Sequence, residues 1–178
     1  MPEDPNAELS RQEYWDERYG KDAEKGEKSY DWLRNFDTIR QFLTKHLPAA
    51  SANLSILHMG NGNSVGQLVM ILDLSVLLQE LYLLTSDDEQ TLPASLLELG
   101  YANQTAIDFS PVVTQNMATA HPGINWQVMD IRELTYQDFS WDICIDKATL
   151  DAMLYGSLWD PEDEVRENVK SYVDEVGV

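Results

Sequence analysis

The feature that most constrains the fold of this chain is the alternation of short apolar runs with helical segments along its second half. The runs at 54–59, 104–107, 124–129 and 141–145 have the length and composition of buried strands. Helical patterns lie between and after them, including 111–120, which begins with the start signal Ser110-Pro111, and 161–176. Alternating strands and helices predict a parallel sheet with crossover helices, so the expected fold class is α/β with about four strands.

The region before the first strand predicts two helices. Residues 1–8 are expected to form a loose tail, followed by a short helix over 10–19 with Ser10 at its N-cap. The segment 20–29 is charged and contains two glycines, which predicts a loop. Apolar residues then recur at helical spacing over 32–47 as far as Pro48, which predicts an amphipathic helix.

Length and charge narrow the classes of function. A chain of 178 residues suggests one domain, and 12 basic against 31 acidic residues give a net charge of −19. This charge argues against nucleic acid or an anionic membrane as the main partner. The single cysteine excludes an internal disulfide framework, and no cluster has the spacing of a metal site, so no metal is expected.

One long apolar run, 65–84, has nearly the length of a membrane span. It contains Asp73, Gln79 and Glu80, and charged residues near the centre of a span cost about 2.5–3.5 kcal/mol each. We therefore expect a buried or amphipathic helix there, or a disordered insertion, and not a membrane span. The N-terminal residues are acidic and polar and lack a signal core, so the expected location is cytoplasmic.

Three of the four predicted strands end in an acidic residue, and the other runs into a glycine turn, Gly60-Asn61-Gly62. Ligands of open α/β sheets bind beyond the carboxyl ends of the strands, where Asp108, Asp130 and Asp146 are expected to gather. A carboxylate there can accept two ribose hydroxyls or an exocyclic amine. The alternative to a ligand site is that the glycines form an ordinary turn and that the aspartates cap the helices that follow. The turn lacks the third glycine of the dinucleotide fingerprint and the lysine of a phosphate loop.

The succession MGNGNS, AIDFS, VMDIREL and WDICIDKATLDAM, preceded by YWDERY and YDW, resembles the class I S-adenosylmethionine-dependent methyltransferases. It is similar to the branch that methylates lysines of translation elongation factor 1A. That branch usually reads D-K-G-T-L-D after strand four, where this chain has Ala148 in place of the glycine. The resemblance implies a Rossmann-like three-layer sandwich. Strand one would lie between strands two and four, with strand three beyond strand two.

The resemblance also implies S-adenosylmethionine as the cofactor and a set of binding residues. The aromatic residues of the N-terminal helices would close over the cofactor, although core packing is the alternative for them. Asp108 would bind the ribose, Asp130 the adenine edge, and Lys147 would lie beside the methionine moiety. The implied cofactor-binding residues are Trp15, Tyr19, Trp32, Gly60, Gly62, Asp108, Phe109, Asp130, Ile131 and Lys147. No catalytic acid or base is identified, because methyl transfer from a sulfonium mainly needs proximity and orientation. Cys144, in an apolar strand, is expected to be a structural thiol.

The chain departs from the family in two places. Residues 65–90 follow the glycine turn as an unusual insertion, and four strands are expected where class I domains have seven. We therefore expect a C-terminally truncated single domain over 1–178, with strand four as an open edge, weak cofactor binding and little transfer. The expected partner is a protein substrate such as elongation factor 1A. The alternatives are a small-molecule methyltransferase and a catalytically inactive cofactor-binding or interaction fragment.

Overall fold

The computed structural model describes residues 4, 6–25, 43, 45–51, 53–63, 91–146 and 148–176, together with the backbone of 70–72. Two predicted site residues, Trp32 and Lys147, lie outside these residues. Most of the predicted helix 32–47 and most of the segment 65–90 lie outside them as well.

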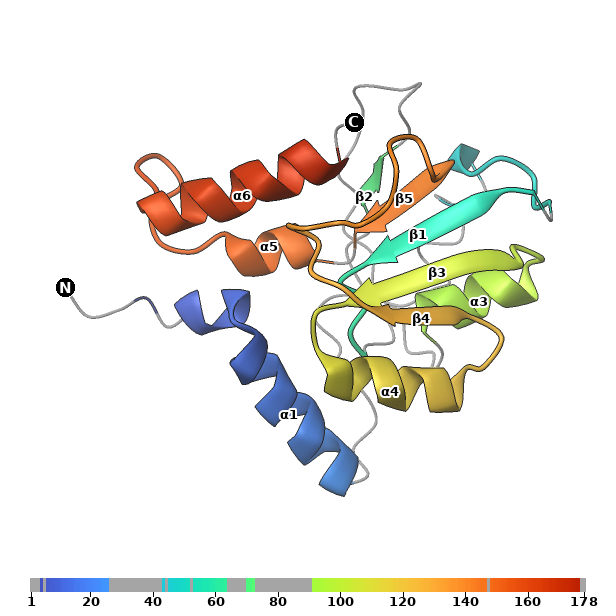
Figure 1. Ribbon diagram of the computed structural model, residues 1–178, viewed down its shortest axis with the longest axis horizontal. Helices are drawn as coiled ribbons and strands as arrows, with labels where there is room; N and C mark the ends of the chain where they lie inside the picture. Colours follow the sequence, from blue (N-terminus) through green and yellow to red (C-terminus); the bar gives the residue numbers. More distant parts are fainter. Residues whose placement is uncertain are drawn as a thin grey trace.

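A parallel sheet forms the centre of the described structure (Figure 1). Its parallel strands are β1 (Ser55–Met59), β3 (Asn103–Asp108), β4 (Asn125–Val128) and β5 (Ile143–Asp146). With the edge strand β2 (Met70–Leu72), the full order is β2-β5-β1-β3-β4. The first predicted strand thus lies between the second and the fourth, and the third lies beyond the second. The structure confirms the predicted α/β fold class and this strand order.

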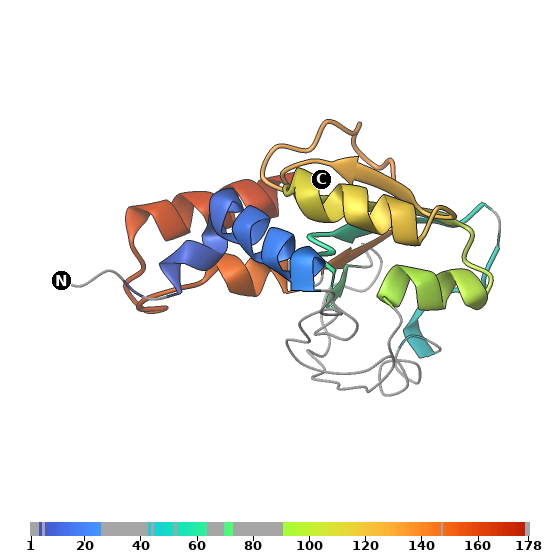
Figure 2. The ribbon, with the colours of Figure 1, turned by 90° about the horizontal axis from the view of Figure 1, so that it is seen from below.

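Helices cover both faces of the sheet, which gives three layers. They are the 3-10 helix η1 (Ala7–Ser10), α1 (Gln12–Lys25), α3 (Leu92–Glu98), α4 (Pro111–Ala120), α5 (Thr149–Met153) and α6 (Asp163–Val176). Figure 2 shows α3 and α6 on opposite sides of the sheet, and α4 packs beside the edge strand β4. Helix α4 begins as predicted, because Ser110 caps it by accepting a hydrogen bond from the Val113 amide.

The two sheet faces bury separate hydrophobic clusters, because successive strand residues point to opposite faces. Ile56 of β1 packs with Leu96 of α3 and Ile145 of β5. Its neighbour Leu57 points the other way and joins the cluster that contains Tyr172 of α6. These clusters fix α3 and α6 against the sheet, and the carboxyl ends of the strands then meet between α1 and α5 (Figure 1).

The N-terminal predictions were partly wrong. The predicted loose tail over 1–8 overlaps η1, where Ala7 is 2% exposed and packs with Tyr155 and Val165. The predicted loop over 20–29 is also wrong as far as Lys25, because α1 continues through Gly20 to that residue. The residues that pack on Ala7 come from the C-terminal third of the chain, so the composition around Ala7 could not indicate that η1 would be held there.

The expected helix over 65–84 is wrong at 70–72. There the chain forms strand β2 (Met70–Leu72), which pairs antiparallel with β5 and matches Met70 to Asp146 and Leu72 to Cys144. Strand four was expected to be an open edge. Over these residues that expectation is wrong, because β2 covers it. An uncovered strand edge offers unpaired amide and carbonyl groups, and a β-capable segment from elsewhere in the chain can satisfy them.

Candidate functional site

A cavity of about 140 Å³ opens at the carboxyl ends of β1, β3 and β4. One water needs only about 10–15 Å³, so this cavity has the size of a small organic ligand. Its walls come from η1, α1, the glycine turn after β1, the ends of β3 and β4, and α5. The lining residues are Leu9, Ser10, Trp15, Arg18, Tyr19, Gly60, Asn61, Gly62, Asn63, Asp108, Phe109, Met129, Asp130, Ile131, Ala148, Thr149, Asp151, Ala152 and Met153.

Eight of the ten predicted site residues line this one cavity: Trp15, Tyr19, Gly60, Gly62, Asp108, Phe109, Asp130 and Ile131. The other two, Trp32 and Lys147, are those that fall outside the described residues. The motifs quoted from four separate parts of the sequence thus converge on a single site.

The glycine turn owes its shape to two positive φ angles, +62° at Gly60 and +55° at Gly62. A Cβ on Gly60 would lie 1.7 Å from the hydroxyl oxygen of Thr149, which in turn donates a hydrogen bond to the Met59 carbonyl at 3.0 Å. A Cβ on Gly62 would lie 2.8 Å from the Tyr19 hydroxyl. The two glycines are therefore required for close packing against α5 and α1.

Asp108 connects the glycine turn to the start of α4. Its Oδ2 accepts from the Gly62 amide at 2.9 Å, and its Oδ1 accepts from the Ser110 amide at 2.9 Å. The residue is 6% exposed. Both carboxylate oxygens thus accept from backbone amides, and these bonds hold the glycine turn against the start of α4.

The YWDERY motif lies on α1 and closes one side of the cavity. Trp15 stacks on Tyr19 with ring centroids 5.5 Å apart, and its indole donates to the Leu9 carbonyl at 2.7 Å. Burial, and then the charge of Asp108, raises the pKa of Tyr19 well above its ordinary value. Tyr19 therefore stays a neutral phenol whose hydroxyl packs on the glycine turn.

Two residues of the same motif were missed by the sequence reasoning. Asp16 accepts a hydrogen bond from the Ser110 hydroxyl, which ties α1 to the N-terminus of α4. Arg18 lines the cavity with its guanidinium 5.8 Å from the centre of the Trp15 ring, and it is the only cationic side chain in the described lining. Arg18 could have been predicted from the sequence, because its spacing to Trp15 and Tyr19 places the three residues on one helix face.

The opposite wall is largely apolar, with half-buried Phe109 and Met129 and buried Ile131. Asp130 lies in this wall, but Arg132 holds its carboxylate, with a guanidinium-to-carboxylate distance of 2.6 Å. Burial alone would raise the pKa of Asp130, and the hydrogen bonds and charge of Arg132 outweigh it and lower that pKa. Asp130 is thus a fixed, ionised side chain in the cavity wall.

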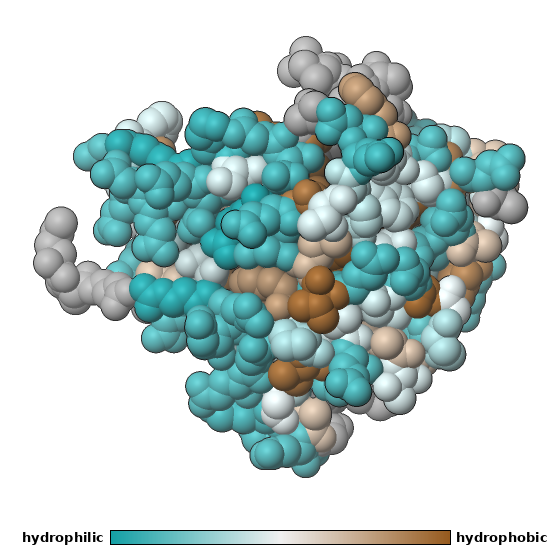
Figure 3. Space-filling model, viewed as in Figure 1, coloured by the Kyte–Doolittle hydropathy of each residue, from teal (hydrophilic) through white to brown (hydrophobic). Residues whose placement is uncertain are grey.

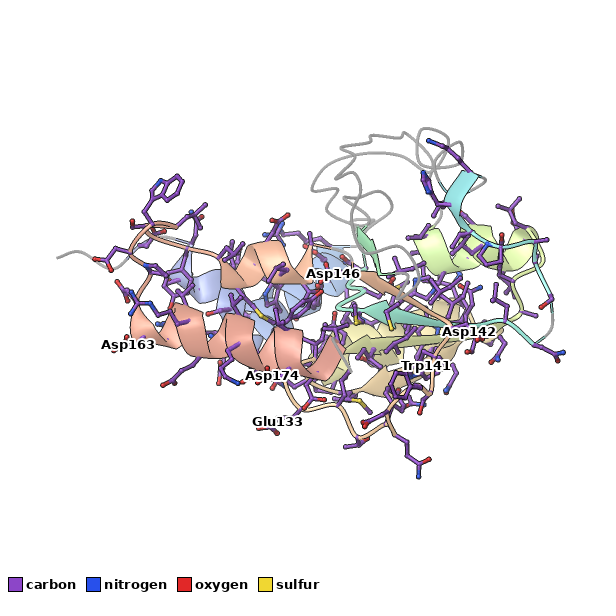
Figure 4. All side chains as sticks on the ribbon, turned by 90° about the horizontal axis from the view of Figure 1, so that it is seen from above. Glu133, Trp141, Asp142, Asp146, Asp163 and Asp174 are labelled. Carbon is purple, nitrogen blue, oxygen red and sulfur yellow. The ribbon has the colours of Figure 1, made fainter. Side chains whose placement is uncertain are left out.

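Asp146 does not join this site, contrary to the expectation that the three strand-end carboxylates would gather. It is 2% exposed and accepts hydrogen bonds from the Thr149 amide at 2.9 Å and the Tyr172 hydroxyl at 2.8 Å. Figure 4 shows Asp146 at the junction between the sheet and α6. Burial raises its pKa to about 6, against the opposing effect of these hydrogen bonds. Asp146 therefore joins α5 and α6 to β5.

The thiol of Cys144 is structural, as expected. Burial raises its pKa to about 11, so it is protonated at neutral pH, and it packs against the α6 side of the sheet outside the cavity lining. A protonated thiol is a poor nucleophile.

Helix α5 supplies the last wall and begins at an unusual backbone conformation. Ala148 has φ 62° and ψ 18°, the left-handed region, at the position where the motif of the resembling branch has glycine. Asp151 follows in the first turn of α5, lines the cavity and is exposed. Asp151 is thus an exposed acidic residue of the lining, whereas the carboxylates of Asp108 and Asp130 are held by protein donors.

Among the residues that the structure describes, none of the helices combines the length and the apolar composition of a membrane span. Nor do these residues hold a group of three or more side chains suited to bind a metal ion.

Comparison with known proteins gives a consistent set of relatives. The chain is 32% identical to EEF1A lysine methyltransferase 4 of Mus musculus over 99% of its own length and 58% of that protein. It is 30% identical to the protein of the same name from Bos taurus, over 99% of this chain and 60% of the relative. It is 25% identical to the human eEF1A lysine and N-terminal methyltransferase, over 96% of this chain and 20% of that protein. No family model matches the chain.

Proposed function

We propose that this chain, which is homologous to the EEF1A lysine methyltransferases, binds S-adenosylmethionine in the cavity and takes part in lysine methylation of a protein. The chain spans about 58–60% of the length of the first two relatives, so the activity, substrate and partner of the whole protein are proposals. The observation that carries the proposal is the convergence of the YWDERY, glycine-turn and strand-end residues on one cavity.

The donors and acceptors of the cavity fit this cofactor. Arg18 offers a cation for the methionine carboxylate, since guanidinium groups form strong charge-assisted hydrogen bonds with carboxylates. Asp108 lines the cavity, and its carboxylate is an acceptor suited to ribose hydroxyls. Phe109, Met129 and Ile131 offer an apolar surface for the adenine ring. S-adenosylmethionine, when bound, supplies an electrophilic methyl group on a sulfonium.

The residues of this chain contribute position and exclusion of water. Trp15 and Tyr19 cover the cavity from α1, and the bond between Asp16 and Ser110 holds that helix in place. Methyl transfer from a sulfonium mainly needs proximity and orientation once the attacking lysine has lost its proton to solvent. Asp151 offers negative charge at the cavity, which attracts a lysine ammonium and also favours its charged form. Asp151 is therefore proposed to attract the substrate, and it is not proposed as the base.

The test is transfer of a labelled methyl group from S-adenosylmethionine to purified elongation factor 1A by the 178-residue chain. The control substrate is the same factor with its lysines blocked by reductive methylation. Label that enters the unblocked protein alone supports protein-lysine methylation.

Two other outcomes would contradict the proposal in different ways. Label found only in small molecules of a cell extract favours the small-molecule methyltransferase. Cofactor binding without transfer to any substrate favours the non-catalytic binding fragment.

A further inference from the structure

The loop between α5 and α6 presents the most exposed large apolar side chain of the described residues. Trp159 is 99% exposed, and its neighbour Leu158 is 66% exposed. A tryptophan can bury about 150–250 Å², and contiguous apolar side chains exposed to water are a mark of interaction sites.

This loop is anchored where it begins, and one hydrogen bond closes a turn within it. The Gly156 amide donates to the Asp4 carboxylate at 3.1 Å, and the Asp160 amide donates to the Ser157 hydroxyl at 3.2 Å. Tyr155, which precedes the loop, is 5% exposed and packs in the cluster with η1 and α6. Leu158 and Trp159 are therefore exposed on a loop whose start is anchored to η1 and to the segment before it.

The charge around this surface is strongly negative. Residues 160–167 contain five acidic side chains and one basic side chain, Arg166. Arg166 pairs with Asp160 at 3.1 Å and Asp163 at 3.3 Å, and the side chains of those two aspartates are 92% and 91% exposed. Figure 4 shows Asp163 at the outer end of α6, and Figure 3 shows a predominantly hydrophilic surface over that helix.

We propose that Leu158, Trp159 and the acidic start of α6 form a docking surface for a basic segment of the protein substrate. This inference rests on the proposed function. A lysine or arginine side chain can pack on the face of the Trp159 ring, and the surrounding carboxylates attract it from a distance. An exposed tryptophan followed along the chain by five acidic residues is complementary to such a segment, and tryptophan is enriched at binding hot spots.

The place of this surface in the fold suits a substrate. The loop begins directly after α5, whose residues Asp151, Ala152 and Met153 form one wall of the cavity. Helix η1, which packs on α5, contributes Leu9 and Ser10 to the same cavity. The loop that carries Leu158 and Trp159 therefore follows, along the chain, the helix that contains Asp151.

The experiment measures direct binding of elongation factor 1A to the immobilised chain, so that the reading does not depend on methyl transfer. The variant is Trp159→Ala, and the matched control is Phe139→Ala, another aromatic side chain that is 76% exposed but follows β4. We expect Trp159→Ala to raise Kd about five- to thirtyfold and Phe139→Ala to leave it unchanged. A second variant, Glu162→Gln with Glu167→Gln, should reduce the dependence of Kd on salt.

S-adenosylhomocysteine affinity, measured on the same variants, should be equal to that of the unmodified chain. The docking proposal is overturned if the unmodified chain does not bind elongation factor 1A, or if the tryptophan and phenylalanine variants bind it equally. Failure of the unmodified chain to bind S-adenosylhomocysteine would contradict the proposed function instead, whichever way the docking result falls.

Discussion

Replacement of Ala148 by glycine should stabilise the protein, although it removes a methyl group. Ala148 has φ 62° and ψ 18° and occupies the N-cap position of α5. A left-handed conformation costs a residue with a Cβ about 1–2 kcal/mol. Glycine also suits an N-cap better than alanine does. The backbone at this position thus favours the residue that the related motif has and this chain lacks.

The magnitude follows from two opposing effects. Relief of the left-handed backbone contributes about 1–2 kcal/mol, and the greater freedom of glycine in the unfolded chain costs about 0.5–1 kcal/mol. The expected net gain is about 0.5–1 kcal/mol. For a chain of this size each kcal/mol shifts Tm by about 2–4 °C, so Tm should rise by about 1–4 °C.

The assay is thermal unfolding followed by circular dichroism, with Ala118→Gly as the matched control. Ala118 is exposed within α4, where glycine should cost about 0.5–1 kcal/mol and lower Tm. The same substitution should therefore raise Tm at position 148 and lower it at position 118. If Ala148→Gly lowers Tm as Ala118→Gly does, the left-handed assignment at Ala148 is wrong.

Three further perturbations test the site and its support. Arg18→Gln should weaken S-adenosylhomocysteine binding about 10- to 100-fold by calorimetry, because it removes charge-assisted hydrogen bonds; unchanged affinity would exclude Arg18 from ligand binding. Burial raises the pKa of Asp146 to about 6, so its contribution to stability is fully present below about pH 3.8 and is lost as pH rises through 6. Between pH 4 and 7 the free energy of unfolding, measured with urea, should therefore fall by about 3 kcal/mol in the unmodified chain and not in Asp146→Asn. If the free energy falls equally with pH in both proteins, this reasoning is wrong. Gly60→Ala should lower Tm sharply because its Cβ would overlap Thr149, whereas Gly20→Ala, in open space within α1, should raise Tm; equal effects would refute the packing argument.

Much of the fold could be predicted from the sequence because its signals are local. The four parallel strands are short apolar runs with polar ends, and Ser110-Pro111 marks the start of α4 as expected. Strand β2 could not be predicted, because its partner is the distant strand β5 and no local periodicity indicates that pairing. The buried position of Ala7 likewise depends on Tyr155 and Val165, far away in the sequence.

The site shows the same division between local and tertiary information. Asp108, Asp130 and Asp146 have equivalent positions at strand ends, and the sequence gives no reason to separate them. The position of α6 separates them, because it brings Tyr172 to Asp146 and makes that carboxylate a structural group. Arg18 was recoverable from its spacing to Trp15 and Tyr19. The ion pair between Asp130 and Arg132 required knowledge of the folded loop.

The most direct test of the account is a calorimetric titration of the 178-residue chain with S-adenosylhomocysteine, alongside Asp108→Asn and Asp138→Asn. Asp108→Asn keeps one oxygen acceptor for the glycine turn, and Asp138 is an exposed aspartate outside the cavity lining. We expect one binding site in the unmodified chain, about 10- to 100-fold weaker binding in Asp108→Asn, and unchanged binding in Asp138→Asn. No binding by the folded unmodified chain, or equal affinities for the two variants, would contradict the assignment of this cavity to S-adenosylmethionine.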